Sequence, residues 1–360
     1  MICVVSVVDS ISPTSMPINE FVIYRSTHKF PMRQAVIVCD DKAPDSVRIP
    51  SDVQVVLVDK NRKKLRNAVI SLQEQCRKDN MDIVYHMHHQ KSALLFLTAT
   101  VGLGIRRHTL YTVHSTFGSR NLKYRISSCL CSLWAKQANC VSNAAFQEYA
   151  PWVRKIKKES FQAIPNGVDV DRIDEVLGNT DIQHHRKTLV CVGRMIPLKN
   201  HVFLLDVMKE LPDFKLLLIG AEDLAGQIRK RVEELEIADR VFFEGLIPRN
   251  DVFKKLCEAS VYVSSSTVEG LPVSVLEAMR SGLVPIVSDI MPHCEIADCC
   301  EEMYVLPLKK EIWVNTIRNL SELSQKEFDE KSYAVRESVK KNFSLENMHK
   351  RYIEVYNDLV

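Results

Sequence analysis

The chain has 360 residues, enough for two domains, and its 46% hydrophobic and 26% charged residues are ordinary for a soluble globular protein. Its eleven cysteines are scattered and form no C-x-x-C pair, which is typical of small core side chains in a reducing compartment. No apolar run reaches the roughly 20 residues that span a bilayer. The first residues lack a basic leader and a cleavage site, so we expect a first strand there and not a signal peptide. The expected location is cytoplasmic, at most peripheral to a membrane.

The net charge of +3 hides an asymmetry between the two halves. Residues 1–150 carry 19 Lys and Arg against 11 Asp and Glu, whereas the remaining 210 carry 29 against 34. Basic clusters lie at 62–66, 106–108 and 154–158. They are either solvated helix faces or contacts to an anionic membrane surface or lipid-phosphate acceptor. Nucleic acid is not expected as a partner, because no recognition motif accompanies the charge.

Short β-branched runs alternate with amphipathic helical stretches along the whole chain. Strands are predicted in the first half at 3–9, 35–39, 53–59, 83–88, 109–114 and 138–142, with a helix over 62–77. In the second half they are predicted at 188–193, 215–220, 240–244, 260–264, 284–288 and 303–306, with helices over 201–211, 224–235 and 250–259. This alternation predicts two α/β domains, each with a parallel sheet covered on both faces.

The boundary between these domains is expected in the loop-forming run Ile-Pro-Asn-Gly-Val-Asp at 164–169. The predicted domains are therefore 1–166 and 167–343. Residues 344–360 carry apolar side chains at helical spacing, from Met348 to Leu359. This helix follows the last strand of the second sheet, so it is free to pack elsewhere.

The most informative motif is Glu-Gly-Leu-Pro-Val-Ser-Val-Leu-Glu, which runs from Glu269 to Glu277 directly after a predicted strand. A strand, a tight loop and a helix start expose free backbone N–H groups and the positive end of the helix dipole, so they favour an anion. The two carboxylates suit hydroxyl groups instead. Phosphate and hydroxyls together indicate a sugar nucleotide. The alternative is structural: Ser274 and Glu277 fit a capping box, and Glu269 fits an exposed turn.

Other strand ends in the second half point to the same place. In open parallel sheets, ligands bind beyond the carboxyl ends of the strands. Arg194 and Lys199 follow the first of these strands, and Gly220 and Leu246 follow the next two. Arg binds phosphate in a bidentate way and Lys acts as a point charge, so the pair would neutralise a diphosphate leaving group.

Histidines cluster near two strand ends of the first half. His86, His88 and His89 resemble metal-ligand spacing, but no Cys or carboxylate is placed to complete a site, and no metal is expected. His114 ends a predicted strand and is either a polar residue facing a ligand or a packed core histidine.

These motifs together resemble glycosyltransferase family 4, which has the GT-B fold. The resemblance rests on 164–169, on Val-Gly-Arg-Met-Ile-Pro-Leu-Lys-Asn at 192–200, on Leu-Ile-Gly at 218–220, on Val-Phe-Phe-Glu-Gly-Leu at 241–246 and on 264–279. It is dense over 165–300 and looser in the first half. It implies two facing Rossmann-like domains with an interdomain cleft, the acceptor on 1–166 and the donor on 167–343, with 344–360 crossing back to the first domain.

The resemblance also implies roles for individual residues. Glu269 would contact the transferred sugar, Glu277 the ribose, and Arg194 and Lys199 the diphosphate, while His114 would lie near an outer hydroxyl of the donor sugar. The remaining nucleotide contacts are expected from Gly220, Leu246, Ile247 and the loop residues Gly270, Leu271, Pro272, Val273 and Ser274. The family retains anomeric configuration and needs neither a cofactor nor a divalent metal.

The expected activity is transfer of a hexose or N-acetylhexosamine from a nucleotide-diphosphate sugar, UDP before GDP, to a glycan or lipid-linked acceptor. Bacterial capsule, exopolysaccharide or lipopolysaccharide synthesis at the inner face of the plasma membrane is the expected setting. The alternatives are a sugar-nucleotide epimerase or hydrolase, and a non-catalytic binding homologue. One departure from the family is a glycine-free loop at 9–21, where Ser15 or Asn19 would offer a helix start to the diphosphate or the acceptor.

Overall fold

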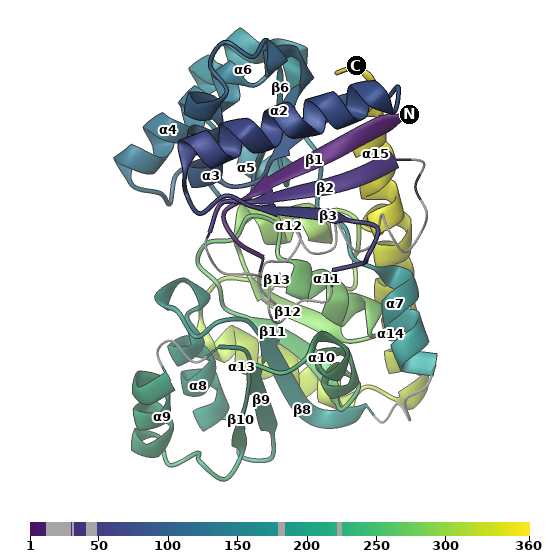
Figure 1. The fold of residues 1–360 in the computed structure, drawn as a ribbon. Helices are drawn as coiled ribbons and strands as arrows, with labels where there is room; N and C mark the ends of the chain where they lie inside the picture. The colour runs from purple at the N-terminus through teal and green to yellow at the C-terminus, as the bar shows by residue number, and fades with distance from the viewer. Residues whose placement is uncertain (12–29, 31, 41–48, 179–183, 222–224) are drawn as a thin grey trace. The chain divides into compact units, whose positions relative to one another are not determined.

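The structure is a computed structural model that describes residues 1–11, 30, 32–40, 49–178, 184–221 and 225–360. The chain divides into two compact units, Met1–Asn166 together with Leu345–Val360, and Gly167–Ser344. Each unit carries one parallel sheet with helices beside it (Figure 1). Within the described ranges, no helix combines the length and the apolarity needed to cross a bilayer.

The first unit contains a parallel sheet in the order β3-β2-β1-β4-β5-β6-β7. Its strands are β1 Ile2–Val8, β2 Met32–Val38, β3 Gln54–Leu57, β4 Asp82–Met87, β5 Thr109–Val113, β6 Gln137–Cys140 and β7 Phe161–Ala163. Its helices are α2 Arg62–Lys78, α3 Gln90–Ala99, α4 Leu122–Trp134, α5 Asn143–Glu148, α6 Pro151–Lys157 and α15 Leu345–Asn357, with short 3-10 turns η1 Ile105–His108 and η2 Lys158–Ser160.

Strand β1 explains how the first sheet is covered on both faces. All seven of its residues are buried, and successive side chains point to opposite faces. Val5 and Val7 enter a core that α2 and α3 close, whereas Ile2 and Val4 pack against Tyr352 and its neighbours on α15. Helix α15 is therefore part of the first unit, although the whole second unit precedes it in the chain (Figure 1).

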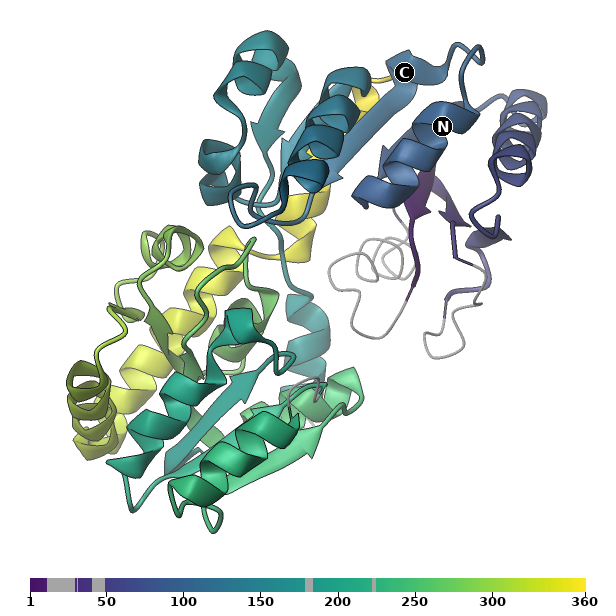
Figure 2. The ribbon, with the colours of Figure 1, turned by 90° about the vertical axis from the view of Figure 1, so that its left-hand side faces the viewer.

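The second unit contains a parallel sheet in the order β10-β9-β8-β11-β12-β13, with helices on both of its faces (Figure 2). Its strands are β8 His185–Val192, β9 Lys215–Ile219, β10 Val241–Gly245, β11 Ala259–Ser264, β12 Val284–Ser288 and β13 Tyr304–Leu306. Its helices are α7 Val170–Gly178, α8 His201–Lys209, α9 Ala225–Glu234, α10 Arg249–Leu256, α11 Val273–Arg280, α12 Met291–Ala297, α13 Lys310–Glu322 and α14 Gln325–Asn342, with a 3-10 turn η3 Pro197–Lys199.

Both sheets reverse their strand order once, and the reversal determines where loops gather. In the first unit the chain moves outward from β1 to β3 and then returns to β4 on the other side of β1. In the second unit it moves from β8 to β10 and then returns to β11 beside β8. The loops after the two central strands diverge at such a point, which is where ligands bind in open α/β sheets.

The alternating pattern correctly predicted the α/β class and every strand but one among the described residues. Strand β7, Phe161–Ala163, was missed because it contains no β-branched residue, whereas the equally short β13 contains Val305.

Candidate functional site

The reversal point of the second sheet brings two loops together, residues 193–200 after β8 and 265–272 after β11. The Ser265 hydroxyl donates to the Asn200 carbonyl at 2.8 Å, and the Thr267 N–H donates to the Leu198 carbonyl at 2.8 Å. Ser265 is fully buried. These bonds fix the loop that carries Glu269 against the loop that carries Lys199.

An ion pair joins the two loops at this edge. The Nζ atom of Lys199 lies 2.6 Å from Oε1 of Glu269, and their side chains are 21% and 12% exposed. Arg194 stands on the same loop as Lys199 and is exposed. The arrangement places a carboxylate that can accept hydroxyl hydrogens beside cations that can bind phosphate.

Glycines at the carboxyl ends of β8 and β9 allow the chain segments beside these loops to pack closely. The Gly193 N–H donates to the Ile219 carbonyl, and the Gly220 N–H donates to the Gly245 carbonyl, both at 2.8 Å. Gly220 has a φ of +146°, and a Cβ on it would lie 2.2 Å from the Gly193 carbonyl oxygen. No side chain fits there, so the packing of adjacent loops alone requires a glycine at 220. Its contact with a nucleotide stays a prediction.

The start of α11 differs from the capping box considered above. The helix begins at Val273 with Pro272 as its N-cap and without a side-chain cap. The Ser274 oxygen instead lies 2.9 Å from the Tyr262 hydroxyl, which donates to it. The capping interpretation is wrong because proline already fixes φ at the helix entrance and the buried tyrosine occupies the serine oxygen. Proline has no N–H, so an anion could receive backbone donors only from Gly270, Leu271, Val273 and Ser274 in this loop.

Glu277 takes part in a buried ion pair that the sequence did not reveal. It is 3% exposed, and its Oε1 pairs with Nη2 of Arg249, the first residue of α10. Its Oε2 is also buried and has no hydrogen-bond partner among the described residues. A buried carboxylate oxygen without a donor is costly, so this atom is ready to accept a hydrogen bond from a ligand hydroxyl.

Leu246 and Ile247 follow β10 in the loop that leads to Arg249. Leu246 is 58% exposed, and Ile247 is partly buried against the core beneath α11. An exposed apolar side chain at a strand end is suited to the face of a planar base. Base contact by Leu246 and Ile247 stays a prediction.

Two histidines near the Lys199–Glu269 pair were also missed. His293 is fully buried, its Nδ1 lies 2.7 Å from the Ser288 carbonyl, and its Nε2 has no hydrogen-bond partner in the described part of the chain. Burial lowers its pKa, and Glu269 opposes that effect. Burial, together with Lys199, lowers the pKa of His201 to about 4. Neither residue stands in a motif, so only the fold brings them to this edge.

His114 belongs to the first unit, at the carboxyl end of β5. Its Nε2 lies 3.3 Å from Nδ1 of His88, and its buried Nδ1 has no hydrogen-bond partner within the described ranges. Burial, reinforced by His89, lowers the pKa of His114 to about 3, so its ring is neutral at pH 7. His89 itself accepts a hydrogen bond of 3.0 Å from the Asp9 N–H.

The His86 ring has a structural role in a buried network. The Thr112 hydroxyl donates to Asn139 Oδ1 at 2.6 Å, so it accepts from His86 Nε2 at 2.6 Å. His86 Nδ1 then accepts from the Tyr356 hydroxyl at 2.8 Å, and Asn139 Nδ2 donates to the Tyr352 hydroxyl at 2.8 Å. The network joins three strands to α15. Among the described residues, no group of three or more His, Cys, Asp or Glu side chains is arranged to hold a metal ion.

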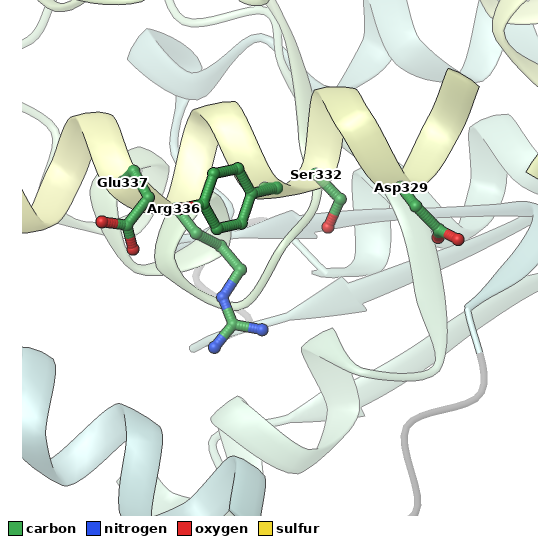
Figure 3. A pocket seen from close by; sticks show the side chains of 5 residues that line it. Asp329, Ser332, Arg336 and Glu337 are labelled. Atoms are coloured by element: carbon green, nitrogen blue, oxygen red, sulfur yellow. The ribbon is translucent and has the colours of Figure 1, made fainter. Parts of the chain in front are cut away.

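Ser15 and Asn19, proposed above for the loop after β1, lie outside the described residues. A hollow of about 340 Å³ is lined by side chains of α14, with Asp329, Ser332, Arg336 and Glu337 along one side of that helix (Figure 3). None of the residues predicted for the donor site lines it.

Comparison with known proteins identifies the family of this chain. The profile of the glycosyl transferases group 1 matches residues 173–334, and the profile of glycosyltransferase family 4 matches residues 23–172. A UDP-Gal:α-D-GlcNAc-diphosphoundecaprenol α-1,3-galactosyltransferase of Escherichia coli is 26% identical over 283 residues, 71% of each chain. A GDP-mannose:cellobiosyl-diphosphopolyprenol α-mannosyltransferase of Xanthomonas oryzae is 25% identical over 64% of each chain.

Solved structures show the same fold. Sucrose-phosphate synthase of Thermosynechococcus elongatus superposes with a TM-score of 0.80 at 17% identity and covers 99% of this chain and 98% of its own. The Anabaena protein HepE, solved with UDP-glucose, superposes with a TM-score of 0.76 at 16% identity, over 99% of both chains. The two profiles together account for most of the sequence, and these neighbours have the GT-B fold. The chain belongs to glycosyltransferase family 4 and is a glycosyltransferase with the GT-B fold.

Proposed function

We propose that this glycosyltransferase moves a hexose or N-acetylhexosamine from a nucleotide-diphosphate sugar to a lipid-linked glycan, with retention of anomeric configuration. The observation that carries the donor assignment is Glu277, whose Oε2 is buried without a donor at the reversal point of the second sheet. A ribose diol supplies the missing hydrogen. UDP is the first choice of nucleotide and GDP the second, since two relatives are named for UDP and GDP sugars.

The proposed mechanism assigns one task to each side chain. Glu269 accepts hydrogen bonds from the hydroxyls of the transferred sugar, and Arg194 and Lys199 stabilise the charge that develops on the leaving diphosphate. Lys199 has three N–H donors, so it can keep its bond to Glu269 while it binds phosphate. His114, neutral at pH 7, offers its unpaired Nδ1 to a donor-sugar hydroxyl.

The first test removes the two charges at this edge. We expect Lys199→Ala and Glu269→Gln each to lower turnover by about 100-fold, the size of a lost transition-state contact. Lys187→Ala, which removes an exposed lysine on β8, is the matched control and should leave turnover unchanged. Full activity in both site variants would contradict the assignment.

The products decide among the candidate reactions. NMR of the product should show a new glycosidic bond with the donor's anomeric configuration. A rearranged or hydrolysed sugar without transfer would indicate an epimerase or a hydrolase instead. The same assay in EDTA tests the proposed independence from divalent metal, and a thermal-shift screen of UDP, GDP, ADP and dTDP sugars identifies the base.

The acceptor and the setting are part of the same proposal. Both relatives named above carry lipid diphosphates in their names, and the basic first half of the chain suits an anionic surface. We therefore place the enzyme at the inner face of the plasma membrane, in the synthesis of a bacterial surface polysaccharide. Salt-sensitive sedimentation with anionic vesicles is the measurement that tests the location.

A further inference from the structure

Two adjoining helices of the first unit present large apolar side chains to solvent. On α4, Leu122, Ile126 and Leu130 recur every fourth residue and are 68%, 54% and 55% exposed. On α6, Trp152 and Ile156 are 52% and 62% exposed. The two helices pack against each other (Figure 1). Single exposed apolar residues are common, but five on neighbouring helices mark an interaction surface, here called the α4–α6 surface.

The charge on these helices has a single sign. Neither α4 nor α6 contains an acidic residue, whereas together they carry the cations Lys123, Arg125, Arg154, Lys155 and Lys157. Two cations, Lys157 and Arg106 of η1, lie where the helices meet. Nζ of Lys157 donates to the carbonyls of Ala135 and Lys136 at 2.6 and 2.8 Å, and Nε of Arg106 donates to the Trp134 carbonyl at 2.7 Å.

The residue composition of this surface favours a lipid bilayer over a protein as its binding partner. The cores of protein interfaces are depleted of lysine, and an acidic partner would need no exposed aliphatic stripe. Helices that lie in a membrane interface combine Lys and Arg with Trp and Leu, as α4 and α6 do. Each cation near an anionic leaflet adds to the attraction, and tryptophan favours the headgroup level.

We propose that the α4–α6 surface docks on a bilayer rich in anionic phospholipid, with Leu122, Ile126, Leu130, Trp152 and Ile156 among the headgroups. The inference deepens the proposed function, on which it rests, by assigning the membrane contact to two helices. It differs from the earlier charge argument because it requires the apolar side chains as well as the cations.

The test uses the whole chain and vesicles of phosphatidylcholine with or without phosphatidylglycerol. Wild type should sediment with the anionic vesicles and only weakly with the neutral ones. Ile126→Ser combined with Leu130→Ser should lower the partition coefficient about tenfold or more, since burial of apolar area drives interfacial binding. The control Tyr333→Ser removes a side chain that is 69% exposed on α14 and should bind as wild type.

A second pair of variants separates charge from apolar insertion. Lys123→Gln with Lys155→Gln should weaken binding severalfold at low salt and little at high salt, because salt screens exposed charges. Lys326→Gln with Lys340→Gln, on α14, is the matched control. Trp152 is the main reporter of insertion, since it is 52% exposed while Trp134 is partly buried and Trp313 is fully buried. Its emission should shift to shorter wavelength when anionic vesicles are added.

The inference is overturned if the wild-type protein does not bind anionic vesicles at low salt. It is also overturned if the serine double variant binds these vesicles as strongly as wild type and shows the same shift of Trp152 emission. Circular dichroism and thermal unfolding verify that each variant is folded. Nucleotide binding and transfer to a soluble acceptor are measured without vesicles. Unchanged vesicle binding by the serine variant therefore rejects the docking surface alone, whereas absence of wild-type binding also rejects the membrane location. Failed transfer rejects the proposed activity.

Discussion

The ion pair between Glu277 and Arg249 balances a buried charge and orients a carboxylate at the predicted donor site. The carboxylate is 3% exposed, and the guanidinium group from α10 balances its charge. The pair fixes one carboxylate oxygen and leaves the other for a ligand. The sequence does not predict this ion pair, because the contact between Arg249 and Glu277 requires that α10 and α11 lie side by side.

Removal of the Arg249 guanidinium group should therefore lower the stability of the folded protein. We expect Arg249→Met to lower the free energy of unfolding by about 3 kcal/mol, because a buried charge loses its partner. The double variant Arg249→Met with Glu277→Leu should regain most of that loss. Lys230→Met, which breaks an exposed pair with Glu234, should change little. Urea denaturation measures all three, and an unchanged Arg249→Met variant would refute the role of the pair.

Gly220 offers a second test at the same scale, with a control built into the chain. A Cβ at 220 would meet the Gly193 carbonyl oxygen at 2.2 Å, whereas a Cβ at Gly226 on α9 would meet nothing within 4 Å. Gly220→Ala should cost at least about 2 kcal/mol of stability or distort the loop after β8. Gly226→Ala should be neutral or stabilise by about 0.5–1 kcal/mol. Equal thermal shifts for the two variants would contradict the steric argument.

At the scale of elements, α15 depends on hydrogen bonds as well as on apolar packing. Tyr356 and Tyr352 reach from this helix to His86 and Asn139 on the sheet. The network gives His86 a structural role in this histidine-rich stretch, as the polar partner of a buried tyrosine. Metal-like spacing at 86–89 did not distinguish these possibilities, since both need polar side chains at a strand end.

The prediction for this element is a tyrosine truncation. Tyr356→Phe should lower the stability of the first unit by about 1–3 kcal/mol, because His86 Nδ1 is left buried without a donor. The control Tyr333→Phe, at an exposed position on α14, should leave the stability nearly unchanged. Protease resistance of residues 1–166 offers a readout for the first unit. A silent Tyr356→Phe would show that apolar packing alone holds α15.

The same elements show what could be predicted from the sequence. Parallel strands and their order of appearance were clear because buried β-branched runs alternate with amphipathic stretches. The rule for strand ends correctly predicted that the loops carrying Lys199 and Glu269 come together, and donor binding at this edge stays a prediction. The start of α11 was misjudged because local capping signals at Ser274 ignore Tyr262, a tertiary partner. The sequence did not predict three further residues at this edge, because only folding brings them there: Arg249, His201 and His293.

Across the whole molecule, buried histidines couple stability to pH. Burial lowers the pKa of His89, His114, His184, His201 and His293. In each case the unfolded chain binds the proton more readily than the folded chain. Stability is therefore complete above the unfolded pKa of about 6.5 and is lost as pH falls toward the folded values.

We expect unfolding free energy to fall steadily between pH 7 and pH 4. Each such histidine contributes up to about 1.4 kcal/mol per pH unit between its unfolded and folded pKa. His201→Phe should reduce the slope, because the pKa of His201 lies at about 4. His185→Asn, at an exposed position, is the control. Denaturation curves at several pH values check this, and a slope that His201→Phe leaves unchanged would count against it.

The position of α15 has a consequence for synthesis on the ribosome. Residues 167–344 emerge as an uninterrupted stretch and can fold as soon as they leave the exit tunnel. The first unit is translated earlier but must wait, since Ile2, Val4, Val84 and Leu110 stay uncovered until the residues up to Leu359 appear. The unit made first is completed last. During that interval its bare apolar face is the part of the nascent chain that a chaperone would shield.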